Sequence, residues 1–145
     1  MFPFPPILSI VLWVWTVYGV LSIVGGILMS ATLMSFVKGP DVAVAATIFC
    51  GLLVAVGVGG LFVWTANGLR SAACRSMVPI AVFSLVWGIL SIVVGAVAPR
   101  KEADLGAVVM LIGLVLIAAG SFALRQRQEY GDWQADVLNW RQRKR

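Results

Sequence analysis

The charged residues are confined to short segments, and this arrangement constrains the fold more than any other feature of the sequence. The 11 Lys and Arg and the 6 Asp and Glu all lie outside four stretches, 1–37, 42–69, 76–99 and 105–124. A helix that crosses the hydrocarbon core of a bilayer needs about 20 apolar residues. Each stretch suffices for one crossing, so the sequence predicts four transmembrane helices, over about 7–36, 43–69, 77–98 and 105–125.

The composition supports a membrane protein. Hydrophobic residues make up 61% of the chain, charged residues 12%, and the mean hydropathy is +0.99. A soluble domain carries about 25% charged residues, and a disordered chain is poor in apolar ones. The predicted fold class is therefore an all-α integral membrane protein. It has four transmembrane helices in an antiparallel bundle (1–125) and a tail with a short amphipathic helix (126–145).

The basic residues of the loops predict the topology. Four crossings place both termini on the same side, together with the loop around 70–76. That side carries eight basic residues and the other side three, Lys38, Arg100 and Lys101. Short loops rich in Lys and Arg stay on the cytoplasmic side. We therefore expect a multi-pass protein with both termini in the cytoplasm, or in the matrix if the membrane is organellar.

A nine-residue motif occurs twice. Residues 18–26 and 87–95 match at an offset of 69, with six of nine positions identical. One interpretation is a duplicated two-helix hairpin, and parallel repeats do occur in transporters. The alternative is convergence, because membrane helices reuse the same few residue types.

Small residues recur at regular spacing within the predicted spans. Lipid provides no hydrophobic force between helices, so association depends on close van der Waals approach, which small residues permit. A spacing of seven suits a left-handed seam and a spacing of four a right-handed crossing. We predict that these residues pack helices together, within the chain or between chains. They are Gly19, Ser22 and Gly26, then Gly51, Ala55 and Gly59, then Gly88, Ser91 and Gly95, and finally Gly106, Gly113 and Gly120.

The sequence offers no recognisable catalytic constellation. It contains no His, and no Asp, Glu, Lys or Arg lies within a predicted span. Proton relays and ion pathways usually need such intramembrane charges. Cys50 and Cys74 form no Cys-x-x-Cys motif, so we expect free thiols. We predict no enzyme activity, cofactor or metal, and we expect the Ser and Thr residues of the spans to bond to carbonyls of their own helices.

The tail has both an apolar face and a basic end. We expect Gly131 to end the helix that leaves the membrane and Asp132 to cap a new one. The predicted contact residues are Tyr130, Trp133, Val137, Trp140, Arg141, Arg143, Lys144 and Arg145. Such a segment suits an anionic membrane surface or a neighbouring subunit. The third interpretation is a frayed end that only sets topology. A short, tethered basic cluster fits nucleic acid poorly.

These features predict a non-catalytic structural or assembly subunit of a larger membrane complex, of the respiratory or photosynthetic type. It would hold other membrane subunits through its glycine-rich helix faces and its tail, and lipid head groups through the inner face. The alternative is a small homo-oligomeric channel or carrier with its pore between protomers. A third hypothesis is a lipid-organising protein that acts through its tail. Whether Tyr18 and Trp87, both near mid-span, face protein, lipid or a pigment is left open.

The topology gives a direct prediction. A reporter tag fused after residue 145 should be read from the cytoplasmic or matrix side, because eight of the eleven basic residues lie there. Protease protection of the tag in sealed vesicles of known orientation measures this. A tag accessible from the opposite side would contradict the topology.

Overall fold

The computed structural model describes residues 4–36, 42–74, 76–97 and 103–143. The chain divides into two compact units. Unit 1 comprises residues 1–14 and 68–145, and unit 2 comprises residues 15–67. Two of the predicted contact residues of the tail, Lys144 and Arg145, lie outside the described residues.

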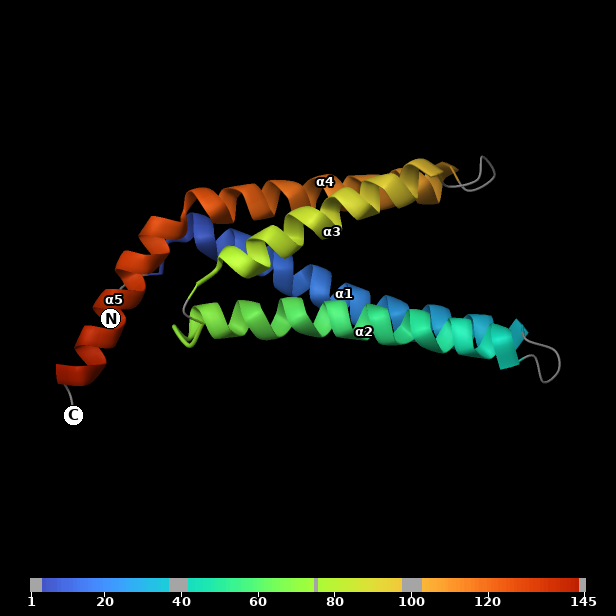
Figure 1. Ribbon diagram of the computed structural model, residues 1–145, viewed down its shortest axis with the longest axis horizontal. Helices are drawn as coiled ribbons and strands as arrows, with labels where there is room; N and C mark the ends of the chain where they lie inside the picture. Colours follow the sequence, from blue (N-terminus) through green and yellow to red (C-terminus); the bar gives the residue numbers. More distant parts are fainter. Residues whose placement is uncertain (1–3, 37–41, 75, 98–102, 144–145) are drawn as a thin grey trace. The chain divides into compact units, whose positions relative to one another are not determined.

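The described residues form five helices and confirm the all-α fold class (Figure 1). Their bounds are α1 Pro6–Phe36, α2 Val42–Arg70, α3 Val78–Val97, α4 Ala103–Arg125 and α5 Arg127–Arg143. The first four are long and apolar enough to cross a membrane. How much of each lies within the bilayer stays a prediction.

In unit 1, α3 and α4 form an antiparallel pair with a seam of small residues. The facing positions are Ala81 with Gly120, Gly88 with Gly113, and Gly95 with Gly106. Each step along the seam is seven residues on both helices, so the same side of each helix meets its partner at every contact. All five of the predicted packing glycines of these helices therefore have a partner of equal or similar size.

The central contact of this seam brings backbone against backbone. A methyl group on Gly88 would lie 2.7 Å from the carbonyl oxygen of Gly113 and 2.8 Å from Cγ1 of Ile117. A methyl group on Gly113 would lie 2.6 Å from the carbonyl oxygen of Gly88 and 2.8 Å from Cγ1 of Ile92. The contact is reciprocal, and neither position has room for a side chain.

Unit 2 contains the same contact between α1 and α2. A methyl group on Gly19 would lie 2.6 Å from the carbonyl oxygen of Gly59, and one on Gly59 would lie 2.5 Å from that of Gly19. Gly19 and Gly88 are 69 residues apart, but Gly59 and Gly113 are 54 apart. The two hairpins thus correspond with different offsets in their first and second helices.

One expected member of the α1–α2 seam is absent from it. Gly26 faces Ala55, but Gly51 has nothing within 4 Å of an added methyl group. Seven residues before Gly59 the residue on α2 is Leu52, whose Cδ1 would lie 4.0 Å from a methyl group on Gly26. Gly51 is one residue away, and one residue is a turn of about 100° on an α-helix. The four-residue spacing therefore carries Gly51 off the contact face.

Two serines correct the expectation that hydroxyls in the spans bond within their own helix. Thr47, Thr65 and Ser91 do so, each to the carbonyl four residues earlier. Ser22 instead donates to the carbonyl of Ala55 on α2 at 3.1 Å. Ser84 donates to that of Leu116 on α4 at 2.8 Å and is fully buried. These bonds cross between helices because the small-residue seams bring a neighbouring carbonyl within reach.

The seams predict a sharp contrast between two glycine substitutions. Gly113→Leu should destabilise the protein by about 1–3 kcal/mol, the typical cost of overpacking a tight contact. Gly57→Leu, on α2, should be tolerated because nothing lies within 4 Å of its added methyl group. The yield of monodisperse protein and its midpoint of thermal unfolding in detergent measure both. Equal behaviour of the two variants would contradict the packing role of Gly113.

Candidate functional site

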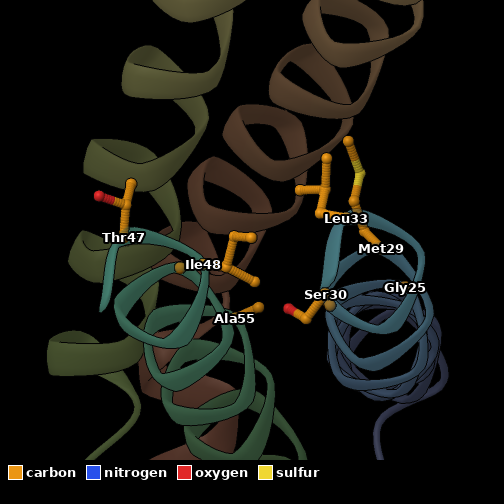
Figure 2. Close-up of a pocket in the computed structure, with 9 residues that line it drawn as sticks. Gly25, Met29, Ser30, Leu33, Thr47, Ile48 and Ala55 are labelled. Atoms are coloured by element: carbon orange, nitrogen blue, oxygen red, sulfur yellow. The ribbon is translucent and has the colours of Figure 1, made fainter. Parts of the chain in front are cut away.

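Unit 2 has a cleft of about 370 Å³ between α1 and α2. Glycine and alanine form much of its lining, and larger apolar side chains complete it (Figure 2). Ser30 and Ile48 turn toward the space between the two helices (Figure 2). The lining residues are Gly25, Gly26, Met29, Ser30, Leu33, Thr47, Ile48, Gly51 and Ala55.

The cleft follows from an interruption of the small-residue seam. On α1 the seven-residue series runs from Gly19 to Gly26 and then reaches Leu33. On α2 it runs back from Gly59 to Leu52. Leucines at seam positions hold two backbones further apart than glycines do. The α3–α4 seam has no such interruption, because all six of its facing residues are Gly or Ala.

The cleft is suited to an apolar occupant. Its lining contains no ionisable side chain, and its polar atoms are backbone groups and the hydroxyls of Ser30 and Thr47. The Thr47 hydroxyl already donates to the carbonyl of Ala43 at 2.9 Å. Among the described residues no group of three His, Cys, Asp or Glu could hold a metal ion. The cleft therefore offers shape and van der Waals contact rather than acid–base chemistry.

A second candidate surface lies in unit 1, where α5 packs on the connector between α2 and α3 (71–77). The prediction that Gly131 ends a helix is wrong, because α5 runs from Arg127 to Arg143 through this residue. The chain changes direction at Gln126 instead, and α5 turns away from the axis of α4 (Figure 1). A glycine inside a helix costs about 1 kcal/mol. The contacts of the neighbouring residues with the connector offset that cost.

Three side chains of α5 donate hydrogen bonds to carbonyls of the connector. The Tyr130 hydroxyl lies 2.8 Å from the oxygen of Cys74. The Gln134 amide lies 2.9 Å from the same oxygen and 3.2 Å from that of Ala72. Arg141 lies 3.2 Å from the oxygen of Ser71. These bonds satisfy carbonyls that follow the end of a helix and have no helical partner of their own.

The backbone of the connector is strained at Ala72, whose carbonyl accepts a hydrogen bond from α5. Ala72 has a φ of 57°, the left-handed conformation that usually falls to glycine after a helix. Its amide donates to the carbonyl of Leu69, and the amide of Ala73 donates to that of Gly68. A non-glycine residue pays roughly 1–2 kcal/mol for this backbone conformation. The bond from Gln134 to the Ala72 carbonyl helps to hold it.

The structure separates the predicted contact residues of the tail into two groups. Tyr130 is 2% exposed; its ring packs inside unit 1 while its hydroxyl donates to the connector. Trp133 and Val137 are half-buried, and the Trp133 ring meets Phe4 edge-on at 4.8 Å. The exposed members are Trp140, Arg141 and Arg143. Gln134 was not predicted, although its spacing of four from Tyr130 places it on the same helix face.

An arginine and a tryptophan form a cation–π pair at this end of unit 1. The guanidinium of Arg70, the last residue of α2, lies 4.9 Å from the ring centre of Trp13. Its Nη2 atom has no hydrogen-bond partner among the described residues, and neither does Nε1 of Trp133. Cys74 is free, and its Sγ would lie 2.5 Å from a methyl group on Gly68. We call this region, which carries Arg70, the connector and α5, the basic end.

The two aromatic residues left open by the sequence both have aromatic neighbours. The ring of Tyr18 meets Phe62 edge-on at 5.3 Å. Trp87 stacks on Phe83 of the same helix at 6.0 Å. Offset and edge-on pairs of this kind stabilise aromatic packing. Their rings therefore contact protein on at least one side.

A scan against protein-family models, a search of curated proteins and a search of solved structures found no match to this chain. The cleft and the basic end are therefore the two candidate functional surfaces. Each surface includes residues that the sequence alone gave no reason to regard as functional. Gly25, Met29 and Leu33 in the cleft and Gln134 at the basic end are examples.

The environment of Tyr130 predicts a pH dependence. Burial, and to a lesser degree the nearby Cys74 thiolate, raise the pKa of the Tyr130 hydroxyl from 10.0 to about 12. The folded protein keeps this proton where the unfolded chain releases it, so stability should fall as the pH rises from 10 to 12 and stay flat from 7 to 9. In a Tyr18→Phe variant, Tyr130 is the single tyrosine, and its tyrosinate absorbance reports the pKa directly. A midpoint near 10 in the folded protein would contradict the burial.

Proposed function

We propose that this membrane protein is a non-catalytic structural or assembly subunit of a larger membrane complex. It would receive an apolar transmembrane segment of a partner in the α1–α2 cleft. The observation that carries the proposal is the position of Gly25 and Gly51. Both line the cleft, and neither contacts anything within 4 Å of an added methyl group.

Small residues with open space above them are what a helix interface in lipid requires. Because glycine has no side chain, another helix can approach closely at these positions. A glycine that faces lipid provides no comparable packing contact. Gly19, Gly26 and Gly59 are already occupied within the hairpin, whereas Gly25 and Gly51 are available to a partner. Met29, Leu33 and Ile48 provide the apolar walls that would hold its side chains.

Cross-linking from inside the cleft tests this proposal. A diazirine side chain replaces Met29 in the full-length protein, expressed in its native membrane, and its cross-links are mapped by mass spectrometry. We expect a stoichiometric cross-link to a transmembrane segment of a different, larger protein. The matched control carries the same side chain at Leu53, which is exposed and does not line the cleft, and should cross-link mainly lipid.

A pair of double variants then measures the contribution of the cleft. Gly25→Leu/Gly51→Leu fills it, and Gly57→Leu/Gly60→Leu adds the same bulk where no neighbour lies within 4 Å and where the cleft is not lined. We expect the first variant to lose partner association about tenfold or more, which corresponds to about 1.4 kcal/mol, and the second to retain it. Cross-links from position 29 to a second copy of the chain would instead favour a homo-oligomer. Cross-links to lipid alone would refute the proposal.

A further inference from the structure

The contacts of α5 fix its depth relative to the membrane. The connector joins the end of α2 to the start of α3, and both helices are candidate membrane spans. We therefore infer that the connector lies at the level of the head groups. Tyr130, Gln134 and Arg141 bond to it at Ser71, Ala72 and Cys74. These donors extend over about 16 Å of helix at 1.5 Å per residue. The helix is therefore held along the membrane surface rather than projecting from it.

The charges of α5 are sorted by face. Asp132 follows Tyr130 by two residues, and Asp136 follows Gln134 by two. Two residues are a rotation of about 200°, which places both acids on the side away from the connector. Arg127 precedes Arg141 by fourteen residues, close to four full turns, so these two arginines share the side that meets the connector. The basic side of α5 thus meets the connector, and the acidic side is turned from it.

Arg70 adds a cation at the same level. It is the last residue of α2, and its guanidinium lies over the ring of Trp13. Within the described part of the chain it forms no ion pair, so no carboxylate neutralises it. Trp13 is 58% exposed, and tryptophan is enriched where the head groups meet the hydrocarbon. Arg70, Arg127 and Arg141 together give this level a positive charge, and none of the three forms an ion pair with a described residue.

We propose that the basic end is a binding site for anionic phospholipid head groups, with Arg70, Arg127 and Arg141 facing their phosphates. The argument for this occupant is charge complementarity. The cations face the membrane surface, and the acids of the same helix are turned from it. Guanidinium groups form strong, geometrically matched hydrogen bonds with phosphate. This site lies in unit 1 and is independent of the partner proposed for the α1–α2 cleft.

Lipid retention provides the test. The full-length protein is reconstituted in nanodiscs of phosphatidylcholine with added phosphatidylglycerol and re-extracted in mild detergent, and the retained lipids are quantified by mass spectrometry. We expect phosphatidylglycerol to be enriched over its share in the nanodisc. Arg127→Gln should lower the enrichment about fivefold, because a basic residue near an anionic surface contributes about 1 kcal/mol.

The matched control is Arg143→Gln. It removes the same charge from the same helix, but Arg143 follows Arg141 by two residues and so lies on the opposite side. Both arginines are exposed and neither substitution removes a hydrogen bond of the connector, so both variants should fold. The control should retain the enrichment. No enrichment in the unaltered protein, or an equal loss in both variants, would overturn the site.

Discussion

Contact between glycine backbones inside the membrane is the interaction on which this structure depends. Lipid gives two apolar helices no reason to associate beyond the closeness of their packing. At Gly88 and Gly113, and again at Gly19 and Gly59, each glycine meets the carbonyl of the other. These close approaches also bring neighbouring carbonyls within reach of Ser22 and Ser84, so the hydrogen bonds between helices are a consequence of the same seams.

The two hairpins show how a small change in such a seam creates a surface. In α3–α4 each of the three facing pairs consists of Gly or Ala, and the two backbones meet at all three. In α1–α2, Gly26 still meets Ala55, but Leu33 follows Gly26 by seven residues on α1 and Leu52 precedes Gly59 by seven on α2, and a cleft lies between the helices. The closed hairpin is suited to hold unit 1 together. The open hairpin is the one with glycines left for another molecule, which is the basis of the proposed subunit role.

The sequence predicted much of the architecture but less of either candidate site. The charge-free stretches mark the four long helices, because a bilayer tolerates few charges and demands about 20 apolar residues. The tail was harder to predict. Gly131 resembles a helix terminator, yet tertiary contacts of Tyr130 and Gln134 keep α5 continuous through it. Tyr130 resembles a surface aromatic, yet it is buried because the connector supplies acceptors for its hydroxyl.

The sequence by itself determined that the chain is a helical membrane protein. The positions of the charged residues and the lengths of the apolar stretches can be read directly from the order of residues. It also marked the seven-residue series of small residues. Only the tertiary structure decided which of them meet, because contact depends on the register between two helices. A shift of one residue, about 100°, separates Gly51 from the seam position at Leu52. The anchoring of α5 was likewise decided by tertiary contacts, since its acceptors lie some 60 residues earlier in the chain.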